Sequence, residues 1–181
     1  MPEYVEGEPY IVNGIWLINR THTVDEKYLV EGPGTDGLQA EASKYYEKMR
    51  AAAAKQGHYI YISMGYRSFE EQTEIYARNV RALGKNQKAA APPGASEHSA
   101  GLAADICSQE GCGNNFGASE SGKWVAKNAW KYGFILRYPK TKTEITGYQY
   151  EPWHFRYIGR EHTAAFHEDP ELTLEEYLGV E

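Results

Sequence analysis

The sequence is poor in three features that would each point to a particular class of protein. Lys and Arg total 19 against 25 Asp and Glu, so the net charge is −6 and no nucleic-acid partner is expected. No apolar run approaches the roughly 18 residues that a membrane-spanning helix requires, so we expect no membrane span. Cysteine is nearly absent, and Cys107 and Cys112 have no second pair with which to build a typical zinc-cysteine site.

Three interpretations of these two cysteines remain open from the sequence. They are five positions apart, which suits a small disulfide loop, a pair of free thiols or a pair of metal ligands. A disulfide would indicate an oxidising compartment, because such bonds persist there.

The chain is long enough to bury a substantial core within one domain. Aromatic residues make up 13% of it and include 15 tyrosines, which argues against disorder. Since it contains no repeat, low-complexity tract or linker, we expect a single domain over residues 1–181, with the motif-bearing core at 11–160.

Local patterns predict helices and short strands without regular alternation, which indicates the α+β class. Apolar spacing and capping signals predict helices at 38–56, at 69–83 with Ser68 as N-cap, from Ser119 or Ser121 to Lys131, and at 171–178. We expect strands within 11–19, 58–64, 101–106, 134–138 and 153–158. The segment 111–117 is interpreted as a flexible excursion, and 139–146 as a turn-rich connection.

The stretch 96–105 carries the first concentration of chemistry. His98 lies among small residues, while Asp105 lies in a short apolar segment that we expect to be buried. A buried carboxylate is costly unless it is paired or bound to a metal. His98 taken alone is more typical of a structural or exposed histidine, but Asp105 beside it favours a metal site.

A second stretch offers the same kinds of group. Glu151 and His154 are three apart and would face opposite ways in an ideal strand. Pro152 restricts Glu151 and bends the entry to the strand, so that both side chains reach one site. The alternative is a simple Glu–His hydrogen bond. Spacing alone does not say which carboxylate is the ligand and which the base.

Four ordered stretches resemble the zinc D-alanyl-D-alanine carboxypeptidases, including the VanY and VanXY types and their L,D-carboxypeptidase relatives. The first is SEHSAGLAADI at 96–106, and the others are GYRSFEEQ at 65–72, YGFILRYP at 132–139 and YEPWHFRYIG at 150–159. This resemblance implies the Hedgehog/DD-peptidase zinc fold, in which a small antiparallel sheet is flanked by helices.

The resemblance also implies roles for individual residues. His98, Asp105 and His154 would bind one zinc ion per chain, and Glu151 would be the general base. Arg67 would hold the terminal carboxylate of the substrate, a task that suits guanidinium because it can form two parallel hydrogen bonds. The resemblance also implies that Gln72, Ser96 and Trp153 bind the substrate. Without it, Gln72 would be a helix-surface residue, Ser96 a turn residue and Trp153 a core residue.

The implied function is removal of the C-terminal D-alanine from peptidoglycan stem peptides or their precursors. Alternatives are an L,D-carboxypeptidase acting on tetrapeptide stems, a cell-wall endopeptidase and a non-catalytic zinc-bearing binding module. L,D activity would require a group that receives a long amino-bearing side chain, and Glu97 and Glu144 are the candidates. An aromatic-rich strand better suits a small pocket, which favours D,D activity.

The implied location is the bacterial cell envelope or the exterior. Residues 1–4 are neither basic nor apolar and do not resemble a signal peptide. Our expectation is therefore a protein whose signal or anchor has been removed, with a cytoplasmic location as the alternative. The oligomeric state is not indicated.

Overall fold

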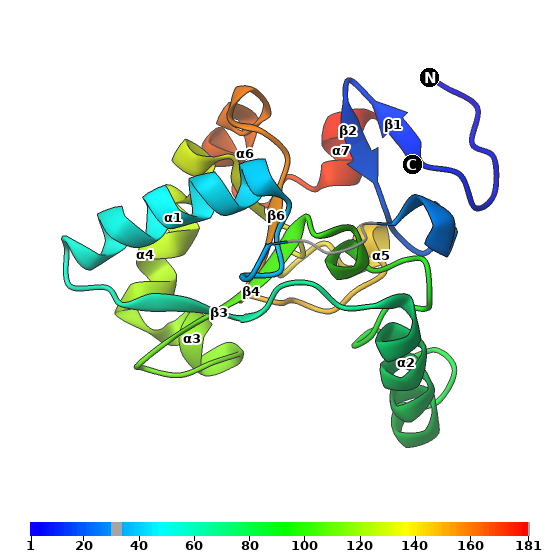
Figure 1. The fold of residues 1–181 in the computed structure, drawn as a ribbon, viewed down its shortest axis with the longest axis horizontal. Coiled ribbons are helices and arrows are strands. Elements are labelled where there is room, and N and C mark those ends of the chain that lie inside the picture. The colour runs from blue at the N-terminus through cyan, green and yellow to red at the C-terminus, as the bar shows by residue number, and fades with distance from the viewer. Residues whose placement is uncertain (30–33, 181) are drawn as a thin grey trace.

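The architecture is a four-stranded antiparallel sheet with helices on its faces and ends, as expected for the α+β class (Figure 1). The computed structural model describes residues 1–29 and 34–180. The strand order is β3-β4-β6-β5, formed by Ile60–Met64, Ala103–Ser108, His154–Tyr157 and Phe134–Leu136. Strands β3 and β5 are therefore the edges, and the motif strands β4 and β6 lie at the centre.

One face of this sheet carries the main core. Alternation along β6 places Phe155 and Tyr157 in the core and turns His154 and Arg156 to the opposite face. Helices α1 (Ala40–Ala54) and α4 (Glu120–Asn128) lie on the core side of the sheet in Figure 1. His154 is thereby left on the face of the sheet opposite the core, and the packed sheet holds it in place.

Helix α2 (Phe69–Leu83) leaves the end of β3 and projects from the body of the molecule (Figure 1). Its start is confirmed as predicted: Ser68 accepts from the Glu71 backbone N–H, and Glu71 accepts from the Ser68 N–H, forming a capping box. Gln72 is its only buried residue, so the helix depends on this single polar anchor near its first turn.

The N-terminal apolar run forms a hairpin, where the sequence analysis expected one strand. β1 (Tyr10–Val12) pairs with β2 (Ile15–Leu17) across Asn13-Gly14, both of which have positive φ. Asn-Gly is the preferred pair for a tight hairpin turn and divides the run. The hairpin packs with α7 (Leu174–Leu178) in a second apolar cluster.

Two segments contain more helix than expected. The stretch expected to be a flexible excursion ends in α3 (Asn114–Ala118), and Gly117 packs so closely on Pro152 that a Cβ there would lie 2.4 Å from a Pro152 carbon. The connection at 139–146 ends in α5 (Thr143–Thr146). Tertiary contacts and the Cys107–Cys112 bond order residues that by composition resemble loops.

The C-terminal region contains α6 (Ala164–Glu168) before α7, whereas one helix was expected. Short 3₁₀ helices complete the chain at Glu26–Tyr28, Glu97–Ala100, Ala129–Tyr132 and Arg160–His162. The predicted helix to Lys131 is thus α4, capped by Ser119 and continued by the third of these turns.

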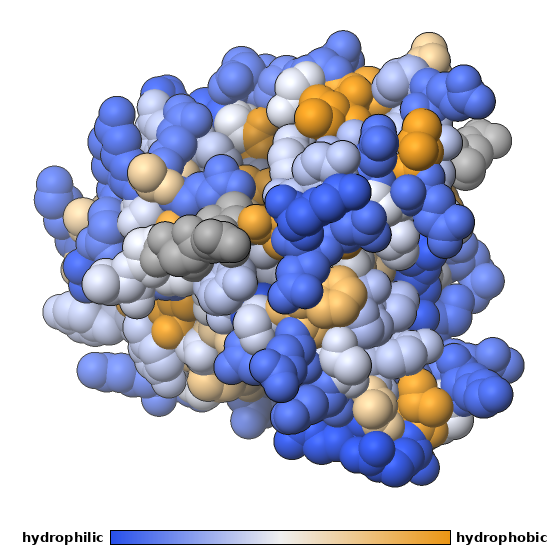
Figure 2. Space-filling model, turned by 45° about the vertical axis from the view of Figure 1, so that its right-hand side comes forward, coloured by the Kyte–Doolittle hydropathy of each residue, from blue (hydrophilic) through white to orange (hydrophobic). Residues whose placement is uncertain are grey.

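The face drawn in Figure 2 is largely hydrophilic, and its hydrophobic residues lie in separate small patches. None of the helices formed by the described residues combines the length and apolar character needed to cross a bilayer.

Candidate metal site and its surroundings

His98 reaches the site from the 3₁₀ turn Glu97–Ala100. Gly101 follows with φ 62°, a left-handed conformation that turns the chain directly into β4. The Nδ1 atom of His98 lies 2.7 Å from the Gly65 carbonyl oxygen. A carbonyl only accepts, so Nδ1 carries the proton. In the neutral ring Nε2 is then left with a lone pair facing Asp105.

Glu151 and His154 meet as the Pro152 argument predicts. The His154 backbone N–H donates to the Glu151 carbonyl at 3.1 Å, closing a turn through Pro152-Trp153 just before β6 begins. Glu151 Oε2 consequently lies 3.7 Å from His154 Nδ1. The turn brings the two side chains to one site although an ideal strand would separate them.

The three predicted ligands converge. Asp105 and His154 are direct partners in the antiparallel β4–β6 pair, and Asp105 Oδ1 lies 3.2 Å from His154 Nδ1 and 3.3 Å from His98 Nε2. One ligand atom from each residue falls within 4.8 Å of the others. This compact set of two imidazoles and a carboxylate suits zinc with a fourth position open.

Asp105 provides the test of whether a cation fits. Its Oδ1 atom is buried and accepts no properly directed hydrogen bond from the described residues. Burial alone would raise the pKa of Asp105, but His98 and His154 hold it well below its usual range. A buried ionised oxygen facing two ring nitrogens favours a positive charge among the three groups, which a metal ion would supply.

Glu151 has the properties of a general base. Its side chain is buried, and burial raises its pKa to about 7 although His154 and Arg67 favour the charged form. A base works best when its pKa lies near the working pH.

A cavity of about 180 Å³ joins Glu151, the three ligands and Arg67. Arg67 lies just beyond β3, and its Nη1 donates to Gln72 Oε1 at 2.8 Å. Its Nε is buried without a hydrogen-bond partner among the described residues. The Arg67 guanidinium group is therefore held in place by Gln72, while its Nε–H donates to none of the described residues.

The other predicted substrate-binding residues differ in position. Ser96 and Trp153 line the cavity. Gln72 does not line it: its side chain is fully buried, with Nε2 donating to the Ala91 carbonyl at 2.6 Å and Oε1 accepting from Arg67. In this structure Gln72 positions Arg67, and direct contact with substrate stays a prediction.

His154 is supported by a buried group of charges that the sequence analysis largely missed. Glu97 Oε2 lies 3.3 Å from His154 Nε2, while Glu97 Oε1 accepts from Arg137 at 2.7 Å and from Arg156 at 2.8 Å. Arg137 also pairs with Glu175 of α7, which accepts from Asn19. Arg156, on the same strand as His154, thereby ties β6 to Glu97.

Both candidates for an amine-binding acid fail in this structure. The Glu97 carboxylate is fully buried and occupied by two guanidinium groups, which outweigh the effect of burial and hold its pKa well below the usual range. Glu144 lies beside a different pocket, near His22 and Glu175. Neither is free to receive a substrate amine in the metal cavity.

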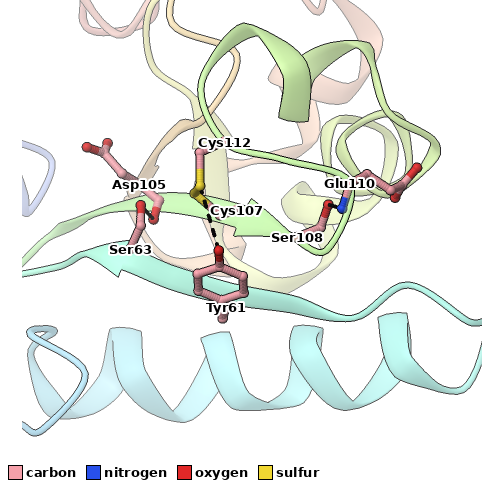
Figure 3. The surroundings of a disulfide bond; sticks show 7 residues. All are labelled: Tyr61, Ser63, Asp105, Cys107, Ser108, Glu110 and Cys112. Carbon is pink, nitrogen blue, oxygen red and sulfur yellow. Dashed lines mark hydrogen bonds between the residues drawn. A yellow bond between two sulfur atoms is a disulfide. The ribbon is translucent and has the colours of Figure 1, made fainter.

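The cysteines form the disulfide, one of the three alternatives (Figure 3). Cys107 lies two residues after Asp105 on β4, and Cys112 belongs to the loop before α3. The bond therefore joins the ligand strand to the segment whose Gly113 and Gly117 lie against Trp153 and Pro152.

Three convergent ligands beside a carboxylate base are the arrangement of a mononuclear metallohydrolase. Comparison with known proteins gives the family. Residues 35–160 match the family described as VanY: D-alanyl-D-alanine carboxypeptidase. The chain belongs to this family.

The similar proteins include both substrate types. The putative carboxypeptidase YodJ of Bacillus subtilis is 46% identical over 146 residues, covering 78% of this chain and 53% of YodJ. The LdcB LD-carboxypeptidase superposes with a TM-score of 0.82 and 34% identity, covering 98% of both chains. A mutant of the D,D-pentapeptidase VanY in complex with Zn(II) has a TM-score of 0.77 and 36% identity, covering 90% of this chain and 97% of that one. The chain spans about half the length of the first curated relatives, 53% and 44%.

Proposed function

We propose that this protein is a zinc-dependent D,D-carboxypeptidase that removes the C-terminal D-alanine from peptidoglycan stem peptides. The observation that carries the proposal is the single cavity in which Arg67 and Glu151 flank the three ligand residues. A base beside a metal site supports hydrolysis, and a fixed guanidinium beside both supports recognition of a free carboxylate. The relative bound to Zn(II) supports zinc as the metal.

Each group has a defined task in the reaction. Bound zinc would lower the pKa of water and polarise the scissile carbonyl. Glu151 takes the proton from the attacking water and delivers it to the leaving amine. Arg67 lines the cavity and holds the terminal carboxylate there, while Gln72 fixes its orientation. Glu151 argues against a non-catalytic binding module, and Arg67 argues against an endopeptidase.

The cavity favours a D-alanine before the scissile bond. The three acidic side chains that line the cavity are Glu97, Asp105 and Glu151, and all have other roles. No further carboxylate among the lining residues is available for an amino-bearing side chain. L,D-carboxypeptidase activity is the second candidate, because the structural similarity to LdcB is extensive.

We also propose that the protein acts in the cell envelope or outside the cell. The Cys107–Cys112 disulfide supports an oxidising compartment. Fractionation of the native host, followed by detection of the protein in the envelope or the medium, tests this location.

The decisive experiment compares two synthetic stems with the zinc-loaded protein and follows the products by mass spectrometry. The pentapeptide ending in D-Ala-D-Ala should lose one residue faster than the tetrapeptide ending in one D-Ala. Glu151→Gln should keep zinc yet reduce kcat by about 10²-fold or more. A preference for the tetrapeptide would establish L,D activity instead, and cleavage of neither stem would overturn the proposed function.

A further inference from the structure

The face of β3 that is turned away from the core is left open beside the metal site. Ile60 is buried in the core, whereas Tyr61 is 49% exposed and Ser63 is also exposed. Tyr61 pairs directly with Cys107, so the two side chains share a face of the sheet. Figure 3 shows Tyr61 and Ser63 beside the disulfide and Asp105.

The register fixes the order of groups along this face. Arg67 lies beyond the end of β3, Asp105 is opposite Met64, and Cys107 is opposite Tyr61. At about 3.3 Å per residue along β3, Tyr61 lies about 10 Å from Met64, and Arg67 lies three residues beyond Met64 in the other direction. The metal site therefore lies between the carboxylate-binding Arg67 and the disulfide.

A substrate bound by its C-terminus has only one direction left along the strands. With its carboxylate at Arg67 and its scissile carbonyl at the metal ligands, its preceding residues leave the cavity away from α2. Figure 1 places α2 at one end of β3 and α3 toward the other. That direction leads over Ser63 to Tyr61 and the Cys107–Cys112 bond.

The path is bordered by the disulfide loop on one side and by a groove at the edge of β3 on the other. On one side the Tyr61 hydroxyl lies 3.7 Å from Cys112 Sγ, and the loop held by the disulfide packs through Gly113 and Gly117 on Trp153 and Pro152. On the other side, a groove of about 730 Å³ runs along the edge of β3 from Tyr61 to Tyr66. Its other wall is formed by residues 34–37 and by Tyr46, Glu47 and Arg50 of α1, so the groove borders the open face at the edge of β3.

We infer that Tyr61, Ser63 and the disulfide form an extended binding surface for the stem-peptide residues that precede the penultimate one. The inference rests on the proposed function for the direction of the substrate. The occupant is an extended peptide, whose backbone lies along the strand and whose side groups pack on the exposed Tyr61 ring. This surface gives the enzyme a means of preferring a full stem over a free dipeptide.

The test measures binding and cleavage of two ligands that share the same C-terminus. N-acetyl-D-Ala-D-Ala fills only the cavity, whereas the pentapeptide also reaches the proposed surface. Calorimetry on zinc-loaded Glu151→Gln protein gives binding without turnover, and kcat/KM is measured on the corresponding proteins with Glu151 intact. Tyr61→Ala should reduce the preference for pentapeptide over dipeptide about tenfold in both measurements, the effect of losing about 1.4 kcal/mol.

The control is Tyr28→Ala, which removes another exposed tyrosine, from the turn Glu26–Tyr28. It should leave the preference unchanged. An unchanged preference in the Tyr61 variant, or equal losses for both ligands, would overturn the inference. If the parent protein binds both ligands but cleaves neither, the proposed function fails while the calorimetric comparison still decides whether the surface binds peptide.

Discussion

His98 and His154 are both predicted metal ligands, but they are oriented by different kinds of contact, one neutral and one charged. His98 is oriented by one neutral contact, from Nδ1 to the Gly65 carbonyl at 2.7 Å. His154 is oriented by the Glu97 carboxylate, which belongs to a buried group with Arg137, Arg156 and Glu175. Both contacts fix the ring nitrogen that carries the proton, so they leave the other nitrogen to face the metal position.

The difference lies in how much of the chain each histidine depends on. The carbonyl support is local and needs only the backbone conformation at the end of β3. The charged support needs two carboxylates and two guanidinium groups buried together, because an unpaired buried charge is costly. It draws on Glu175 of α7 and on Trp16 of the hairpin, whose carbonyl accepts from Arg156 at 2.7 Å. The site thus depends on residues outside the 35–160 family match.

The largest effect is expected from Glu97→Ala, which removes the centre of the charged support. Arg137 would keep Glu175, but Arg156 would lose its only carboxylate partner among the described residues. Breaking a buried pair costs about 3–5 kcal/mol, and loss of a group that orients a metal ligand lowers metal affinity about 10–100-fold. Urea unfolding and zinc titration measure the two losses.

Glu47→Ala is the control for this variant. It also removes a carboxylate bound to arginine, but the Glu47–Arg50 pair is exposed on α1. We expect its stability and zinc affinity to stay near those of the parent protein. If Glu97→Ala were as stable and bound zinc as tightly as this control, the charged support would be irrelevant to His154.

A smaller effect is expected from Gly65→Ala, which disturbs the neutral support. A Cβ on Gly65 would lie 2.1 Å from the Asp36 carbonyl oxygen, so the backbone that presents its carbonyl to His98 must shift. Overpacking of this kind costs about 1–3 kcal/mol. Thermal unfolding and zinc titration should both show a loss.

The control here is Gly34→Ala, because a Cβ at Gly34 meets no atom of the described residues closer than 3.4 Å. Normal zinc affinity in Gly65→Ala, despite reduced stability, would mean that His98 does not need its carbonyl to be held in place.

The same contrast explains what the sequence could reveal. His98, Asp105, Glu151 and His154 stand in short motifs, and the effect of Pro152 follows from its local geometry. The capping box at Ser68 is equally local. Such features are predictable because cause and consequence lie within a few residues. The Asn13-Gly14 turn could have been predicted by the same reasoning, and the expectation of a single strand there was wrong.

The charged support was not predictable in this way. Arg137 and Glu175 are 38 positions apart, and each alone resembles an ordinary surface charge. Their pairing follows only when β5 and α7 meet. Arg137 lies in the motif YGFILRYP, after the apolar residues of β5, and a charge at the end of a buried strand was the one available signal.

The smallest effect is expected from Glu175→Gln, at the far end of the charged support. The glutamine oxygen can still accept from Asn19 and from Arg137 Nη2, and Arg137 keeps Glu97, so the variant loses the negative charge and the hydrogen bond from Arg137 Nη1 to the second carboxylate oxygen. At pH 7 the free energy of unfolding should fall by about 1–2 kcal/mol.

Arg137 outweighs burial and lowers the pKa of Glu175 from its ordinary value of 4.5. The stabilisation by the Glu175 carboxylate is therefore complete above about pH 4.5 and disappears as the pH falls through the lowered pKa. Urea unfolding at several pH values should show the gap between parent and variant closing in that range, while Glu168→Gln, at an exposed position on α6, shows no gap at any pH. A gap that stayed constant on acidification would show that the loss comes from packing and not from the Glu175 charge.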